Sequence, residues 1–206
     1  MMTLSRHKEA QHRSPMEMPM PTVFRRTLLA LSAAVLLPVL TAAPAAAMET
    51  AGLVVLMRHA EAPGTGDPPD FKLDDCATQR NLGDGGRAQA ARIGERLRQL
   101  GIDQARVLSS QWCRCLETAR LLDLGPVKEM PALNSFFGRQ EEEKDRTTQL
   151  RQFLADLPRD GKPVVLVTHQ VTVTALTGIF PASGEAVLLR ANGTPNPEQI
   201  DRVRVP

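Results

Sequence analysis

Two unbroken apolar runs, Leu53–Met57 and Val164–Val167, constrain the fold of this chain more than any other feature of its sequence. Short apolar runs without polar alternation are typical of strands that are buried on both faces of a sheet. Each run is followed, two residues later, by a histidine: His59 after the first and His169 after the second. The sequence therefore predicts a buried sheet that carries a histidine at the end of two of its strands.

Helical and strand-like patterns alternate along the rest of the chain. An irregular surface loop is expected over Pro63–Asp75, which is rich in Pro, Gly and Asp and has no periodicity. Helices are expected at Asp84–Leu100, Trp112–Leu122, Thr147–Leu157 and Val173–Leu176. Further strands are expected at Val107–Leu108, Val127–Met130, Ala186–Arg190 and Asp201–Val205. This order predicts an α/β fold, a three-layer α/β/α sandwich with a mostly parallel central sheet.

In such sheets, ligands bind beyond the carboxyl ends of the strands. His59 and His169 both follow such an end, and Arg114 lies shortly after the expected strand Val107–Leu108. Three distant segments are thus predicted to bring two imidazoles and one guanidinium to the same crevice. The carboxylates and cysteines show no familiar ligand spacing, so neither a metal nor a cofactor is expected there.

The first 47 residues have the pattern of a signal peptide that is removed on export. Arg25 and Arg26 precede the apolar run Leu28–Leu40, and a small-residue stretch ending in Ala45–Ala47 follows it. The run is short for a spanning helix, so we expect a periplasmic or secreted protein with no stable membrane span after processing. A retained membrane anchor is the alternative, and the paired arginines leave general and twin-arginine export both open. The remaining domain is expected to cover residues 48–206.

Removal of this segment changes the charge of the chain. It holds five of the 25 Lys and Arg and two of the 23 Asp and Glu, which leaves a net charge of −1 for residues 48–206. A nearly neutral domain has no broad field for nucleic acid, so no nucleic-acid partner is expected. Anion binding must instead come from a local cluster of arginines. The same removal leaves His59 and His169 as the only histidines.

The three cysteines, Cys76, Cys113 and Cys115, would lie in an oxidising compartment after export. Cys113 and Cys115 are two apart on an expected helix and point in different directions, so they are poorly placed to pair with each other. A bond from Cys76 to either of them would tie the long loop to this helix, and one thiol would be left over. A zinc site with a histidine ligand is the competing interpretation; it is disfavoured because both histidines are placed in the crevice.

Four segments resemble, in family order, the motifs of the histidine phosphatase superfamily, branch 1, which is related to the phosphoglycerate mutases. They are Arg58–Glu61, Leu82–Ala90, Ser109–Ala119 and Val165–His169. Together they span most of the chain after residue 48. The resemblance implies a phosphoglycerate mutase-like fold and an exported phosphatase that hydrolyses phosphomonoesters, phosphohistidine or sugar phosphates.

The resemblance also implies a role for each residue of the crevice. His59 would attack phosphorus and form a phosphohistidine intermediate, which water then cleaves. Arg58 and Arg114 would clamp the non-bridging oxygens, and His169 would join this clamp and stabilise the transferring charge. The implied chemistry needs no metal. The partner would be a phosphorylated small molecule or a cell-envelope sugar phosphate, as for an exported relative that acts on a lipopolysaccharide-core heptose phosphate.

The chain departs from the family pattern at the proton donor, because Ser135 stands where many relatives carry a glutamate. The open candidates are Glu61, the loop residues Asp67 and Asp70, and the run Glu141–Glu143, which is more typical of a solvated helix start. Alternatively, the substrate has a good leaving group, such as phosphohistidine, a phosphoanhydride or an aryl phosphate. A second possible function is a catalytically weak or inactive phosphate-binding domain of the same fold.

Overall fold

The computed structural model describes residues 48–205, and the expected signal segment, 1–47, lies outside the described residues. Six strands form one sheet in the order β3-β2-β4-β1-β5-β6. The bounds are β1 Leu53–Arg58, β2 Arg106–Ser109, β3 Val127–Glu129, β4 Val164–Thr168, β5 Ala186–Arg190 and β6 Glu198–Val203. The first four strands in this order are parallel to one another, whereas β5 and β6 pair antiparallel. The expected mostly parallel sheet is confirmed.

The two apolar runs form β1 and β4, which are neighbours at the centre of the sheet. Their apolar residues are all buried, as expected for strands covered on both faces. The two strands pair in parallel, and Arg58 at the end of β1 lies opposite Thr168 at the end of β4. The chain therefore leaves both strands at the same edge of the sheet.

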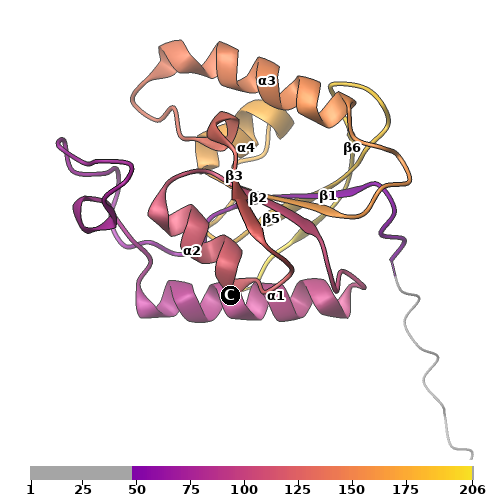
Figure 1. Ribbon diagram of the computed structural model, residues 1–206, viewed down its shortest axis with the longest axis horizontal. Helices are drawn as coiled ribbons and strands as arrows, with labels where there is room; N and C mark the ends of the chain where they lie inside the picture. Colours follow the sequence, from indigo (N-terminus) through magenta and orange to yellow (C-terminus); the bar gives the residue numbers. More distant parts are fainter. Residues whose placement is uncertain (1–47, 206) are drawn as a thin grey trace, which may run out of the picture. The chain divides into compact units, whose positions relative to one another are not determined.

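Four helices complete the three layers, two on each face of the sheet (Figure 1). Side chains alternate along β1, so Val55 and Met57 pack under α1 (Asp84–Gln99) and α2 (Cys113–Leu121). Val54 and Leu56 face the other way, toward α3 (Glu143–Ala155) and α4 (Gln170–Thr177). Three 3-10 turns lie at Cys76–Thr78, Pro131–Leu133 and Gln140–Glu142. No helix within residues 48–205 is long and apolar enough to cross a membrane.

Three elements begin at least three residues earlier than the sequence pattern predicts, among them helix α4, which begins at Gln170 rather than Val173. Helix α3 begins at Glu143 rather than Thr147, because acidic residues in the first turn favour a helix N-terminus without adding to the apolar periodicity. Strand β6 begins at Glu198 rather than Asp201. Its residues are exposed except Val203, so no apolar pattern marks its start, and backbone pairing with β5 defines it instead.

Helix α1 approaches its neighbours closely at two glycines. A Cβ at Gly86 would lie 1.9 Å from the carbonyl oxygen of Glu61, and one at Gly94 would lie 2.1 Å from that of Leu122. Neither carbonyl can move without displacing main chain. These glycines therefore set the distance between α1 and the segments that follow β1 and α2.

We predict that Gly94→Ala lowers the free energy of unfolding by about 1–3 kcal/mol, because the added methyl group would overlap the Leu122 carbonyl. Urea denaturation of the purified domain measures this change. Gly85→Ala is the matched control: it lies in the same helix, is exposed, and meets only the flexible Glu61 carboxylate at 3.5 Å. Equal stability of the two variants would contradict the close-approach argument.

Candidate active site

The register of β1 and β4 brings the two histidines together. The His59 backbone N–H donates to the Thr168 carbonyl at 2.9 Å, so His59 leaves β1 directly beside the residue that precedes His169. The two imidazole rings are 5.5 Å apart between centroids and meet edge to face. Both rings are almost completely buried.

Arg114, in the first turn of α2, joins the two histidines from a third segment. Its Nε donates to His59 Nε2 at 3.2 Å, and its terminal nitrogen NH2 lies 3.5 Å from His169 Nδ1. The side chain is only 4% exposed. The structure thus gathers His59, His169 and Arg114 at the carboxyl ends of three parallel strands.

The hydrogen bonds around His59 determine which nitrogen carries the proton. Nδ1 lies 2.7 Å from the Ala60 carbonyl, which can only accept, so Nδ1 is the protonated nitrogen. Nε2 is then unprotonated, and its lone pair accepts the hydrogen bond from Arg114 Nε. A neutral imidazole oriented in this way presents Nε2 as a nucleophile.

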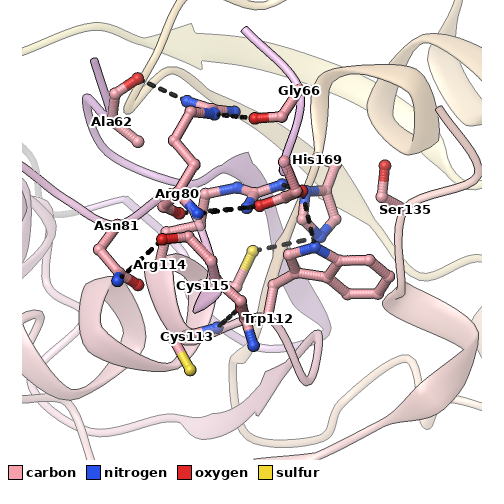
Figure 2. Close-up of polar contacts among 12 residues, drawn as sticks. Ala62, Gly66, Arg80, Asn81, Trp112, Cys113, Arg114, Cys115, Ser135 and His169 are labelled. Atoms are coloured by element: carbon pink, nitrogen blue, oxygen red, sulfur yellow. Dashed lines mark hydrogen bonds and ion pairs between the residues drawn. The ribbon is translucent and has the colours of Figure 1, made fainter. Parts of the chain in front are cut away.

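Both histidines are held in the neutral form. Burial lowers the pKa of His59 well below its ordinary value of 6.5, and the nearby charge of Arg114 lowers it further. Burial and Arg114 lower the pKa of His169 in the same way. Its Nε2 lies 2.8 Å from Ser110 Oγ and 3.4 Å from Cys115 Sγ, and Figure 2 shows this sulfur directed at the ring.

We predict that the domain loses stability as the pH falls from 7 to 5. In this range the histidines bind protons in the unfolded chain, near pH 6.5, but not in the folded protein, so the folded state is favoured at higher pH. Two such groups give a slope of at most about 2.7 kcal/mol per pH unit. Urea denaturation at several pH values measures it. His169→Gln should roughly halve the slope, and a flat profile for the unsubstituted protein would contradict the prediction.

Arg58 lies at the edge of the same cluster. Its NH1 donates to the Pro181 carbonyl at 3.2 Å, whereas its buried Nε has no hydrogen-bond partner among residues 48–205. Burial and the charge of Arg114 lower the pKa of the guanidinium. An oxyanion that approached Arg58 would supply both the missing acceptor and a compensating charge.

Asp67, from the long loop, is the anion that faces this positive cluster. Its Oδ1 accepts from Arg114 NH1 at 2.7 Å and its Oδ2 from Arg114 NH2 at 3.1 Å, a bidentate pair. The Trp112 indole N–H and the Arg80 backbone N–H also donate to it. Burial opposes ionisation of Asp67, but the bonds and charge of Arg114 outweigh it and hold the pKa of Asp67 below its usual value. Asp67 is therefore a carboxylate at neutral pH.

Arg80 was not identified from the sequence, and it holds the loop over the site. Its Nε donates to the Gly66 carbonyl at 2.8 Å and its NH1 to the Ala62 carbonyl at 2.5 Å (Figure 2). These bonds bring the two ends of the loop segment 62–66 together beside Arg114. No local pattern marks Arg80, because an arginine between Gln79 and Asn81 has the appearance of a surface residue.

A disulfide links Cys76 to Cys113, which decides the pairing that the sequence leaves open. Cys113 is the first residue of α2 and directly precedes Arg114, so the bond ties the end of the long loop to the helix that carries this arginine. Cys115 is a free, fully buried thiol, and burial raises its pKa to about 12.

We predict that reduction of this disulfide lowers the free energy of unfolding by about 3–4 kcal/mol, because the bond closes a loop of 37 residues in the unfolded chain. Urea denaturation with and without a thiol reductant measures the change. A double variant with Cys76→Ser and Cys113→Ser should match the reduced protein and show no further response to reductant. An unchanged midpoint after verified reduction would contradict the prediction.

The other acid candidates lie away from the histidines. Glu61 is exposed, and its backbone N–H donates a hydrogen bond to the side-chain carbonyl oxygen of Gln89. Asp70 is also exposed. Glu142 pairs with Arg146 and Arg139, and none of Glu141–Glu143 lines the pocket above the histidines. In the part of the chain that the structure describes, no group of three or more His, Cys, Asp or Glu residues could hold a metal ion.

A pocket of about 580 Å³ opens above these residues. Arg58, His59, Arg114 and His169 line it, together with Asp67 and Ser135. The lining includes four arginines, because Arg80 and Arg139 join Arg58 and Arg114. Asp67 is the one acidic residue in it. The pocket is thus suited to an anionic ligand.

Comparison with known proteins agrees with this geometry. Residues 54–156 match the sequence model of the histidine phosphatase superfamily, branch 1. The chain belongs to this superfamily. Among curated proteins, none is similar enough to match.

Three solved structures illustrate the shared fold. The protein histidine phosphatase SixA, solved with tungstate, is 17% identical over 73% of this chain and 95% of its own, with a TM-score of 0.52. YhfR from Bacillus stearothermophilus is 18% identical over 72% of this chain and 94% of its own, with a TM-score of 0.51. A phosphoserine phosphatase mutant from Entamoeba histolytica, solved with phosphoserine, is 14% identical over 73% of this chain and 95% of its own, with a TM-score of 0.51. At these identities the likeness shows the fold, and it confirms the phosphoglycerate mutase-like architecture.

Proposed function

We propose that this protein is a metal-independent phosphatase that hydrolyses phosphomonoesters through a phosphohistidine intermediate on His59. The observation that carries the proposal is the state of His59: a buried, neutral imidazole whose Nδ1 is bonded to the Ala60 carbonyl and whose Nε2 lone pair faces a guanidinium. The bound tungstate of SixA and the phosphoserine of the Entamoeba enzyme show that relatives of this fold accept tetrahedral oxyanions and phosphoryl groups.

In the first step, His59 Nε2 attacks phosphorus and forms an N–P bond, while the bond from phosphorus to the leaving oxygen breaks and its electron pair stays on that oxygen. The bond from Nδ1 to the Ala60 carbonyl stabilises the positive charge that develops on the ring. In the second step, water attacks phosphorus, the N–P bond breaks, and inorganic phosphate is released with one proton from the water lost to solvent. His59 returns to its neutral form.

Three cationic or hydrogen-bonding groups support this transfer. Arg114 and Arg58 hold the non-bridging oxygens, and the unpartnered Nε of Arg58 gains an acceptor. His169 is neutral, so it contributes no full charge, and a hydrogen bond from it to the phosphoryl group requires the tautomer that carries the proton on Nδ1. Arg114 and His169 are buried at the site, and Arg114 becomes available to the phosphate oxygens when the phosphate displaces Asp67.

We further propose that the protein is exported after removal of residues 1–47 and acts in the periplasm or outside the cell. The Cys76–Cys113 disulfide supports this location, because such bonds persist in oxidising compartments. The substrate would be a phosphorylated small molecule or a cell-envelope sugar phosphate.

A second function, phosphate binding without turnover, is favoured by two observations. Asp67 already occupies the guanidinium end of Arg114, and Ser135 stands in place of an acid. A site of this kind would still bind an oxyanion that displaced the Asp67 carboxylate.

Hydrolysis of p-nitrophenyl phosphate separates the two functions, because its good leaving group departs without a proton donor. We expect turnover by the domain starting at Met48 and a loss of about a thousandfold or more in kcat for His59→Ala. Glu61→Gln is the control, since this exposed residue does not line the pocket and should leave kcat unchanged. Vanadate should inhibit the hydrolysis, because its five-coordinate form resembles the transition state. Absence of turnover by folded protein that still binds phosphate would favour the binding domain.

A further inference from the structure

Aromatic side chains are concentrated at the pocket to a degree that catalysis alone does not require. Residues 48–205 contain six aromatic side chains of Phe and Trp. Four of them line the pocket: Phe71, Trp112, Phe137 and Phe180. They come from four separate segments of the chain, so their gathering is a property of the folded site.

Two of these side chains are exposed. Phe137 is 60% exposed and Phe180 is 70% exposed, and Ile200 is the one other large apolar side chain that is exposed among residues 48–205. Large apolar side chains in contact with water at the mouth of a pocket mark a surface that a ligand covers. Ile200 lies on strand β6 and does not line the pocket.

Phe137 is held in place by the residues around it. The Ser135 hydroxyl accepts from the Phe137 backbone N–H at 3.2 Å, and the Ser135 carbonyl accepts from Arg139 NH2 at 2.8 Å. The preceding Phe136 is buried, which anchors the turn and leaves Phe137 directed outward. The serine at the position of the family's acid thus holds the backbone of Phe137, whose exposed side chain lines the pocket.

Phe180 is coupled to the phosphate-binding end of the pocket. The next residue, Pro181, gives its carbonyl to Arg58 NH1 at 3.2 Å. Helix α4 ends at Thr177, and the C-cap residue Gly178, with a positive φ of 74°, turns the chain toward this contact. The same short segment therefore positions a guanidinium of the site and an exposed ring.

The pocket is thus divided into two chemically different parts. The histidines and Arg114 are buried, and the buried Trp112 ring lies 5.2 Å from the His169 ring, whereas Phe137 and Phe180 of the same lining are exposed. A phosphoryl group alone would bind the histidines and arginines and would leave Phe137 and Phe180 exposed to water. A volume of about 580 Å³ accommodates both a phosphoryl group and an attached ring.

We propose that the substrate is an aryl phosphomonoester whose aromatic ring packs against Phe137 and Phe180 while its phosphoryl group lies at His59. This inference rests on the proposed phosphatase function. An aryl group meets both features of the pocket: its flat face suits the exposed phenyl rings, and an aryloxide leaves with its electron pair more readily than an alkoxide. The aryloxide then takes its proton from solvent, so the ionised Asp67 and the non-acidic Ser135 are no obstacle.

Binding of phosphonates tests this proposal without turnover, because their C–P bond is not hydrolysed. We would measure the Kd of phenylphosphonate, cyclohexylphosphonate and methylphosphonate by calorimetry. Phenylphosphonate should bind about tenfold or more tightly than methylphosphonate, and more tightly than cyclohexylphosphonate, which has similar apolar bulk but no π face.

Substitutions at the mouth locate the ring. Phe137→Ala and Phe180→Ala should each raise the Kd of phenylphosphonate about twofold to tenfold and leave that of methylphosphonate unchanged. Ile200→Ala, an exposed apolar residue away from the pocket, should change neither. Because both phenylalanines are exposed, these variants are expected to fold.

The possible outcomes separate the proposal from the function on which it rests. If the protein fails to hydrolyse p-nitrophenyl phosphate but binds phenylphosphonate preferentially, the phosphatase function is contradicted and the aryl-binding site is supported. Equal affinity for the phenyl and methyl compounds, or no binding of phenylphosphonate, would overturn the proposal even if turnover is found. Equal or tighter binding of cyclohexylphosphonate would overturn the preference for an aromatic ring.

Discussion

The buried guanidinium of Arg114 is the group around which the rest of the site is arranged. An unpaired charge in a protein interior costs on the order of several kcal/mol, so a buried cation requires partners on every side. Arg114 finds them in His59, His169 and Asp67, which come from three different segments. The disulfide at Cys113 and the loop contacts of Arg80 keep this arrangement closed.

The same cation sets the chemistry of its neighbours. Burial and this cation together keep both histidines neutral, and the bonds and charge of the cation keep Asp67 ionised. These two effects have opposite consequences for an incoming phosphate. A neutral His59 retains the lone pair that the proposed reaction needs, whereas the Asp67 carboxylate competes for the guanidinium end that would bind phosphate oxygens. The Trp112 indole and the Arg80 backbone N–H also donate to Asp67, so the carboxylate has partners besides Arg114.

The central sheet and the meeting of His59, His169 and Arg114 could be predicted, because apolar runs mark buried strands and parallel strands end at one edge. The bidentate pair between Asp67 and Arg114 could only be left open, since it depends on the path of a loop without periodicity. Arg80 could not be found, because its role lies in bonds to two distant carbonyls. The aromatic mouth was missed for a similar reason: Phe71, Phe137 and Phe180 are scattered in loops, and only the fold brings them to one pocket.

The absence of an acid at Ser135 and the presence of aromatic residues at the mouth are linked through one short turn. A glutamate at this position would supply a proton to an alkoxide leaving group. Ser135 instead uses its hydroxyl to accept from the Phe137 backbone and its carbonyl to accept from Arg139, whose guanidinium lies over the Trp112 ring. The side chain of Ser135 thus holds the backbone of this turn and supplies no acidic proton. In the proposed reaction, selectivity for the leaving group then comes from binding its ring and from its ability to depart without a proton, rather than from general acid catalysis.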